Sequence, residues 1–280
     1  MQESGLKKDE TVSSPSGRLE GAGFVTLAGA GPGDEELITL KLQRRLATAQ
    51  VIITDRLVNP AIIKNNAAAT AQIILAGKQG YNDNSYTQEE VTALLIKYAK
   101  EGKNVLRLKG GDVAFFSNVL DELEALKAHH ISYEIIPGIT AASGASAYSG
   151  IPLTARGYAQ GVQFIALNPN QYFSTEQWKH IAQSNDTLVF YMAVKNILSL
   201  AEMLLRYSKN PGTGIAVIEQ ATTPHQQVHI TTLKKVAIDF AGKEFSSPSL
   251  IIVGDVVGLY KKYNWNLPDA IGTVFSALVK

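Results

Sequence analysis

Hydrophobic and polar positions follow two patterns in the first half of the chain. Continuous apolar runs predict strands at about 24–30, 51–55, 72–76, 104–110 and 133–138. Helical periodicity predicts helices between them, at about 35–48, 60–68, 87–101 and 118–129. Thr87 and Glu90 have the spacing of a capping box at the start of the third helix. This strict alternation predicts a parallel α/β domain that binds ligands at the carboxyl ends of its strands.

A second set of elements follows Pro137-Gly138. The small residues of 139–150 predict a helix that can approach neighbouring backbone closely, and 151–160 is irregular. Strands are expected at 162–167, 187–192, 214–222, 227–233 and 249–257, with helices at about 174–183, 194–207 and 233–241. The adjacent strands 214–222 and 227–233 predict a hairpin, so the second sheet should be mixed. The fold class is therefore α/β, with two α/β domains over 23–154 and 155–262 and a trough between them.

The two ends of the chain differ from this pattern. Residues 1–22 are polar and mixed in charge, without the apolar stretch of a signal peptide, so we expect a disordered leader. Residues 263–280 form a more apolar tail, which could pack on the body of the protein or on a partner subunit.

Composition narrows the possible functions. The chain is 45% hydrophobic and 18% charged, which is typical of a globular protein with a large core. A net charge of +1 gives no overall field that would attract nucleic acid or a membrane. The absence of cysteine excludes disulfides, thiolate metal sites and cysteine nucleophiles, and is consistent with the cytoplasm. The histidines lack metal-ligand spacing, so no metal is expected.

A glycine-rich stretch, LAGAGPGDEELITL, spans residues 27–40 after the first predicted strand. Asp34 stands where a dinucleotide fingerprint requires its third glycine, and no Gly-Lys-Ser/Thr of a phosphate loop follows. Pro32 removes a backbone donor, and the Asp34 carboxylate would repel a phosphate. The loop therefore favours a nucleoside-like ligand without phosphate, although a tight turn without function remains an alternative.

Further polar residues follow the other predicted strands. The second glycine turn, 110–112, faces the same sheet edge as the first, because both follow parallel strands. Asp55 could place a carboxylate at the cleft, cap a helix, or pair with Arg56 at the surface. Lys78 could neutralise an acidic substrate or remain solvated.

Several motifs occur in the order found in tetrapyrrole methylases, over about residues 23–260: GAGPGDEELITLKLQRRLATAQVIITDRLV, RLKGGD, PGITAASGASAYSGIPLT, TLVFYM, ATTPHQQV and SPSLIIVGDVV. The chain resembles this family, and most nearly the branch that C-methylates uroporphyrinogen III. The resemblance implies two α/β domains joined at a deep trough, usually in a homodimer. It also implies S-adenosylmethionine bound between the domains, S-adenosylhomocysteine as product, and precorrin-2 made towards sirohaem or cobalamin.

The resemblance also implies roles for individual residues. Asp55 and Lys78 fall at candidate acid/base positions, and Arg56 and Arg156, with Lys78, would match the substrate's carboxylates. Together with Gly31 of the first loop, the expected cofactor-binding residues are Pro32, Gly110, Gly111, Asp112, Phe115, Thr140, Ala141, Met192 and Ala221. By composition alone, Met192 would more often be a core residue.

The chain departs from the family pattern mainly on the substrate side. The replacements are Val113 for proline, Asn118 for arginine, Ala155 and Asn168 for histidine, Gly157 for aspartate, and Ala221 for glycine. The first cofactor loop is intact. Two alternatives to uroporphyrinogen methylation therefore remain open: methylation of another tetrapyrrole, and a non-catalytic paralogue that binds cofactor or porphyrin.

Overall fold

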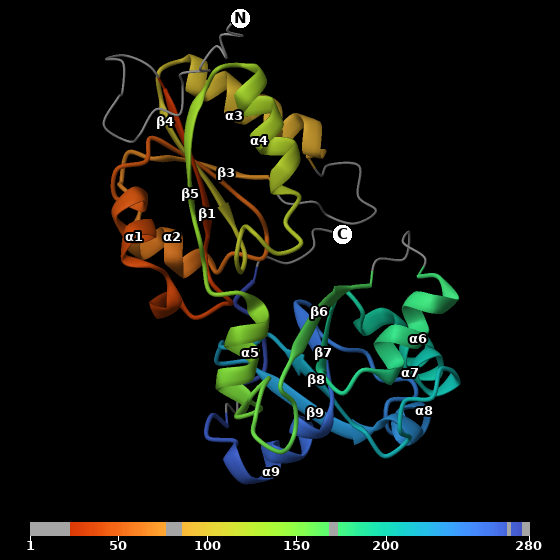
Figure 1. Ribbon diagram of the computed structural model, residues 1–280. Helices are drawn as coiled ribbons and strands as arrows, with labels where there is room; N and C mark the ends of the chain where they lie inside the picture. Colours follow the sequence, from red (N-terminus) through yellow and green to blue (C-terminus); the bar gives the residue numbers. More distant parts are fainter. Residues whose placement is uncertain (1–22, 77–85, 168–172, 268–269, 276–280) are drawn as a thin grey trace, which may run out of the picture.

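The structure is a computed structural model that describes residues 23–76, 86–167, 173–267 and 270–275. The expected leader 1–22 lies outside the described residues, as do Lys78 and Asn168. The described chain forms two α/β units, one above the other in Figure 1, each built on a five-stranded sheet. No helix among the described residues is long and apolar enough to cross a membrane.

The first sheet is parallel, as predicted. Its strand order is β3-β2-β4-β1-β5, and all neighbouring strands run in the same direction. The strands are β1 (Phe24–Gly29), β2 (Val51–Thr54), β3 (Gln72–Leu75), β4 (Asn104–Lys109) and β5 (Ser132–Ile136). Their carboxyl ends point towards the second unit (Figure 1). This edge is where a parallel sheet places its ligands.

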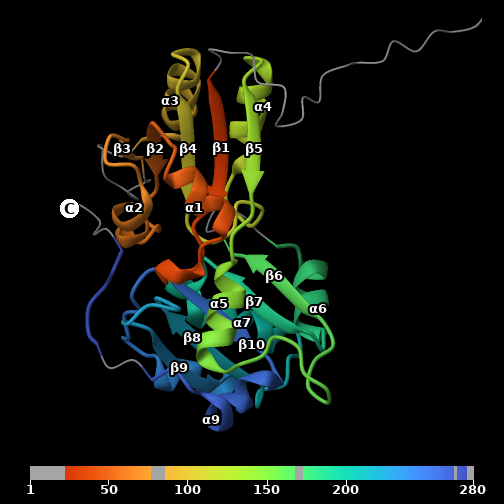
Figure 2. The ribbon, with the colours of Figure 1, turned by 90° about the vertical axis from the view of Figure 1, so that its left-hand side faces the viewer.

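Helices cover both faces of the first sheet (Figure 2). They are α1 (Leu40–Leu46) and α2 (Pro60–Asn66) on one face, and α3 (Gln88–Lys100) and α4 (Val119–Ala128) on the other. The capping box of Thr87 and Glu90 is present at the start of α3. The helix expected at 35–48 is divided, because Ile38 is extended and Thr39 caps α1 by accepting a hydrogen bond from the Leu42 amide.

The second sheet is mixed, as predicted. Its order is β6-β7-β10-β8-β9, with β6 parallel to β7 and an antiparallel hairpin of β8 and β9. The strands are β6 (Val162–Ala166), β7 (Thr187–Tyr191), β8 (Gly214–Glu219), β9 (Gln227–Thr232) and β10 (Ser249–Val253). The strand expected at 249–257 ends at Val253, because Gly254 has a φ of +154° and the chain then enters a 3-10 helix.

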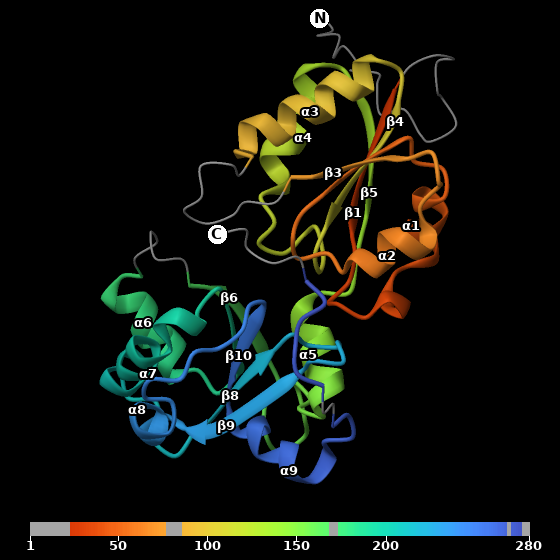
Figure 3. The same ribbon diagram turned by 180° about the vertical axis from the view of Figure 1, so that it is seen from behind.

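Helix α5 (Ala141–Ser149) belongs to the second unit. Its residues Ala142 and Ala145 pack with Val189 and Ile218 of the second sheet. The hydrophobic core therefore places the domain boundary before residue 141, rather than at the expected residue 154. The opposite face of this sheet carries α6 (Thr175–Gln183), α7 (Ile197–Arg206) and α8 (Val236–Asp239), while α9 (Tyr260–Tyr263) lies near α5 (Figure 3).

A charged cluster fastens α1 to the edge strand β5. Glu134 accepts hydrogen bonds from Thr26 and Arg45, and its Oε2 lies 2.9 Å from the Lys41 Nζ. Burial by itself would raise the pKa of Glu134, but these three donors outweigh it and lower the pKa to about 2. Glu134 therefore stabilises the fold while it is ionised.

We expect Glu134→Gln to lower the free energy of unfolding by about 1–2 kcal/mol at pH 7. The pKa shift alone would correspond to a larger loss of stability. The Lys41 side chain is 54% exposed, however, and solvent screens its contribution. The stabilisation is fully present above the unfolded pKa of about 4.5 and is lost as pH falls towards the folded value of about 2. Urea unfolding should therefore show the two proteins converging from pH 5 to pH 3. A constant difference across that range would contradict the assignment.

Candidate active site at the domain junction

The two glycine loops of the first sheet bind each other through their backbones. The Gly31 amide donates to the Gly111 carbonyl at 3.1 Å, and the Gly111 amide donates to the Gly31 carbonyl at 2.8 Å. Both residues have left-handed backbone, with φ of +77° and +71°. A Cβ on Gly138 would lie 2.3 Å from the Gly111 carbonyl oxygen. The loops after β1, β4 and β5 therefore meet at one point, where glycine alone fits.

Asp112 fixes this meeting point. Its Oδ1 accepts a hydrogen bond from the Ala114 amide at 2.7 Å, and its Oδ2 accepts one from the Gly138 amide at 3.3 Å. Both carboxylate oxygens of Asp112 therefore accept hydrogen bonds from backbone amides of the loops. A Cβ on Gly111 would meet only the Ala141 amide nitrogen, at 3.7 Å, so the loop also faces the start of α5.

The first glycine loop is held by the second domain. The Asp34 amide donates to the Thr222 Oγ1 at 3.0 Å, and the Tyr148 hydroxyl donates to the Asp34 Oδ2 at 2.8 Å. Pro32 lies against α5, since a Cβ on Gly144 would lie 2.6 Å from the proline ring. The loop after β2 joins this contact, since Asn59 donates to the Gly33 carbonyl at 2.8 Å. We call this region the domain junction: the loops after β1, β2, β4, β5, β7 and β8, with the start of α5.

The end of β7 closes the other side of the domain junction. The Tyr191 hydroxyl lies 2.8 Å from the Thr140 Oγ1 and accepts a hydrogen bond from the Ala142 amide at 3.1 Å. Burial raises the pKa of Tyr191, so the hydroxyl stays protonated. Met192 follows with a φ of +57° and is 54% exposed, so it is not a core residue. Tyr191 therefore joins the end of β7 to the start of α5, and the exposed Met192 follows it directly in the chain.

Four aromatic rings form a contact between the two domains, which we call the aromatic bridge. Phe115 lies 5.5 Å from Phe164, Phe116 lies 4.8 Å from Tyr191, and Phe164 lies 6.1 Å from Tyr191, between ring centroids. Phe115 and Phe116 remain 40% and 43% exposed, so they present an apolar surface. The sequence analysis identified Phe115 and missed the other three. The Phe-Phe doublet after a glycine turn and a Tyr-Met pair ending a strand were the available signals.

Backbone strain is concentrated in the same loops. Phe116, Met192, Gln220 and Thr222 have φ between +47° and +68°. Such values are uncommon outside glycine, and for a β-branched residue such as Thr222 they are outliers that persist where the surroundings impose them. Ala221 lies between the last two, and its carbonyl oxygen would be 3.0 Å from a Cβ on Gly33. The strained loop therefore holds Ala221 against the first glycine loop.

Asp55 follows β2 at the same sheet edge. Its Oδ1 accepts a hydrogen bond from the Leu57 amide at 3.0 Å, whereas Asn59 is the residue that caps α2. Burial raises the pKa of Asp55, although Arg107, Lys109 and the backbone amides of Leu57 and Gly110 act in the opposite direction. The carboxyl group is therefore partly desolvated and suited to hold or accept a proton.

The two arginines expected to bind substrate lie in different places. Arg56 reaches the second domain, where its Nη2 donates to the Ser247 Oγ at 3.3 Å, and burial lowers its pKa. Arg156 lies in the turn before β6. The opposite end of β6 neighbours Tyr191, so the structure does not bring Arg156 to the domain junction. Arg156 makes no hydrogen bond or ion pair within the described residues.

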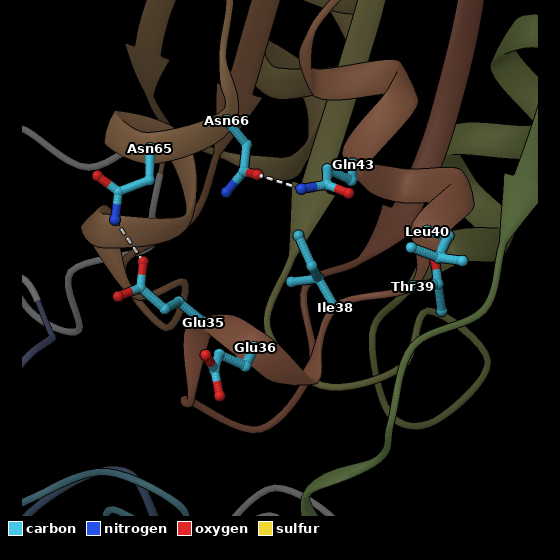
Figure 4. Close-up of a pocket in the computed structure, with 8 residues that line it drawn as sticks. All are labelled: Glu35, Glu36, Ile38, Thr39, Leu40, Gln43, Asn65 and Asn66. Carbon is cyan, nitrogen blue, oxygen red and sulfur yellow. Dashed lines mark hydrogen bonds between the residues drawn. The ribbon is translucent and has the colours of Figure 1, made fainter.

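Two open cavities lie in the first domain, away from this site. The one in Figure 4 measures about 340 Å³, and its polar groups bind each other: Asn65 donates to Glu35, and Gln43 donates to Asn66. The other, about 320 Å³, lies between α1 and the strands β1 and β4. The first cavity borders the connection between β1 and α1, but neither cavity is lined by Gly31, Pro32 or Asp34.

The glycine loops, the aromatic bridge and the strained turns can be compared with known proteins. The family model of tetrapyrrole (corrin/porphyrin) methylases matches residues 25–237. The chain belongs to this family. By that membership it is a methyltransferase, and the α/β fold with two sheets expected from the resemblance is confirmed.

The relatives are of two kinds. The siroheme synthase of Saccharophagus degradans is 38% identical over 250 residues, covering 89% of this chain and 54% of that protein. This chain therefore spans about half the length of the curated relatives that it matches. The uroporphyrin III C-methyl transferase of Thermus thermophilus has a TM-score of 0.72 at 34% identity, with 84% of this chain and 99% of that one covered. A structure of that enzyme with S-adenosylhomocysteine has a TM-score of 0.71, with the same identity and coverage.

The hydrogen bonds of Tyr191 predict a stability effect. We expect Tyr191→Phe to lower the free energy of unfolding by about 1–3 kcal/mol, because the Ala142 amide loses its partner in a partly buried site. Tyr207→Phe is the matched control, since the Tyr207 hydroxyl makes no hydrogen bond within the described chain. Urea unfolding of both variants measures the difference. Equal losses of unfolding free energy in the two variants would show that the contacts of the Tyr191 hydroxyl at α5 contribute nothing to stability.

Proposed function

We propose that the protein transfers methyl groups from S-adenosylmethionine to uroporphyrinogen III and forms precorrin-2. The observation that carries this proposal is the convergence of the three glycine loops on the start of α5 and on Ala221, with Tyr191 bound to Thr140 beside them. These residues come from loops far apart in the sequence. The Thermus relative is a uroporphyrin III C-methyl transferase that has been crystallised with S-adenosylhomocysteine, which supports the substrate and the donor.

The domain junction fits a nucleoside ligand that carries no phosphate. The amides of Gly31 and Gly111 each donate to the carbonyl of the other residue, so these two glycines offer no free donor to a phosphate. The nearby Asp34 carboxylate would also repel a phosphate. The exposed Phe115 and Met192 offer apolar surface for an adenosyl group and a thioether chain. S-adenosylmethionine, when bound, would supply an electrophilic methyl group.

The remaining chemistry falls to the protein's own residues. A pyrrole ring that gains a methyl cation becomes positively charged and must lose a proton. Asp55 is the proposed acceptor, because it is partly desolvated and its pKa is raised. Arg56 would bind a substrate carboxylate, and the rings of Phe116 and Tyr191 would help exclude water. Lys78 keeps its proposed acid/base role, although it lies outside the described residues.

The setting of the enzyme is part of the same proposal. We place it in sirohaem or cobalamin synthesis, in the cytoplasm, as a homodimer that needs no metal and binds neither nucleic acid nor membrane. The family and the absence of cysteine support this setting. In the described part of the chain, no group of three or more histidine, aspartate or glutamate side chains could hold a metal ion.

One observation favours a second candidate, methylation of another tetrapyrrole. Of the two arginines expected to bind substrate, only Arg56 lies at the domain junction. Asn118, which stands where the family pattern has an arginine, has left-handed backbone with a φ of 53°. Asparagine tolerates this conformation better than arginine does, so the loop is shaped for its present residue. Fewer cations would suit a substrate with fewer carboxylates.

Anaerobic incubation with S-adenosylmethionine and uroporphyrinogen III tests the proposal. The absorbance of precorrin-2 should appear together with S-adenosylhomocysteine. Turnover of a different tetrapyrrole in parallel reactions would instead favour the second candidate. Cofactor binding in calorimetry without any methylated product would show a non-catalytic paralogue.

The placement of the arginines predicts a difference between two variants. Arg56→Ala should raise the KM for the tetrapyrrole about tenfold to a hundredfold, because a charge-assisted hydrogen bond contributes about 1.5–3 kcal/mol and each decade is ~1.4 kcal/mol. Arg156→Ala, at the far end of β6, is the matched control and should keep the KM of the unmodified protein. Affinity for S-adenosylmethionine, measured by calorimetry, should change in neither. A raised KM for Arg156→Ala alone would reverse the assignment of the substrate cation.

A further inference from the structure

Three buried charged side chains lie behind the proposed active site and have no part in the chemistry above. Glu122 of α4 is 0% exposed, and its Oε1 accepts a hydrogen bond from the Arg107 Nε at 3.1 Å. Its Oε2 accepts one from the Lys109 Nζ at 2.9 Å. Removing three charges from water costs free energy that pairing offsets only in part. A purely structural role would be filled as well by apolar residues of similar size.

The register of the sheet brings Asp55 to this cluster. Ile53 pairs with Arg107 and Thr54 pairs with Leu108, so Asp55 follows in line with Lys109. Side chains two positions apart lie on the same face of a strand. Ile53 is buried on the face covered by α3 and α4, so Asp55 continues that face towards the carboxyl end of β2.

The charges of this group balance only when Asp55 is included. Arg107 and Lys109 bring two positive charges, and Glu122 brings one negative charge. Within the described residues, Glu122 is the only carboxylate that forms an ion pair with either cation. The uncharged contacts are the Ile53 and Leu108 carbonyls, which accept from the Arg107 Nη1, and Gln88, which donates to Glu122.

Both cations act on Asp55 as well as on Glu122. Arg107 and Lys109 lower the pKa of Asp55, against the burial that raises it. Burial lowers the pKa of Lys109, and its largest compensation comes from Glu122, with a smaller one from Asp55. The neighbouring Arg56 is the other charged group that interacts with Asp55 among the described residues. The two carboxylates therefore share one pair of cations.

We propose that Glu122 is a positioning residue that divides the charge of Arg107 and Lys109 with Asp55, and so sets how readily Asp55 accepts a proton. The proposal rests on the function above, in which Asp55 is the proton acceptor. If Glu122 is neutral, both cations have Asp55 as their only carboxylate, and Asp55 is held in its ionised form. If Lys109 is neutral, Glu122 occupies the remaining cation, and burial favours the protonated form of Asp55.

Carbon-13 NMR of the full chain, labelled at the aspartate carboxyl carbons, tests this directly. Asp55→Asn identifies the signal of Asp55. Glu122→Gln should move the titration midpoint of Asp55 down, and Lys109→Met should move it up, each by roughly one pH unit. Glu122→Asp, which keeps the charge, should return the midpoint towards that of the unmodified protein. Loosened packing would move the two neutralising variants in the same direction, so opposite shifts identify an electrostatic division.

The double variant Glu122→Gln/Lys109→Met guards against loss of folding. It restores the charge balance of the group, so its midpoint should lie close to the unmodified value, and it can be measured even where a single variant does not fold. Shifts of equal sign, no shift, or a displaced midpoint in the double variant would each overturn the proposal.

The pH dependence of turnover separates this inference from the proposed function. The acidic limb of the pH–rate profile should follow the NMR midpoint in each variant. Opposite NMR shifts in a protein that does not methylate uroporphyrinogen III would leave the charge division standing and overturn the function. Normal turnover of uroporphyrinogen III, with an unmoved Asp55 midpoint in the variants, would leave the proposed function standing and overturn the charge division.

Discussion

The structure depends on how closely the first sheet's strand ends approach one another. A side chain on Gly29 or Gly138 would overlap the Gly111 carbonyl, so the loops after β1, β4 and β5 can meet only as bare backbone. The reciprocal hydrogen bonds of Gly31 and Gly111 then fix the direction in which the first loop leaves the sheet. That direction carries Pro32 and Asp34 into the second domain. The domain junction follows from this contact.

The charged side chains near the proposed active site act on one another, rather than through an overall field of the protein. The net charge is only +1, yet buried or half-buried ions gather at the carboxyl end of the first sheet. Asp55 and Arg56 face the domain junction, while Arg107, Lys109 and Glu122 lie behind them. In such surroundings each charge depends strongly on its neighbours, because little water screens them. The protonation of Asp55 is thus a property of the whole group.

Local pattern was enough to predict most of the elements. The alternation of apolar runs and helical periodicity gave the parallel sheet, and the adjacent strands around Pro224 gave the hairpin. Errors occurred where a single backbone angle ended an element, as at Ile38 and Gly254. The position of α5 was also missed. Its small residues predict close packing but not the sheet on which it packs.

The sequence by itself determined the family, the fold class and the residues of the glycine loops, because these depend on short motifs and local periodicity. Only the tertiary structure decided which residues meet. It joined Tyr191 to Thr140 and brought Phe116 and Phe164 to the aromatic bridge. It also directed Arg56 to Ser247 of the second domain, while Arg156 lies before the opposite end of β6. It also placed Asp55 in line with Lys109, beside the ion pairs that Glu122 makes. The physical reason is that these contacts join residues tens of positions apart, and their geometry is set by sheet register and packing, which no local pattern encodes.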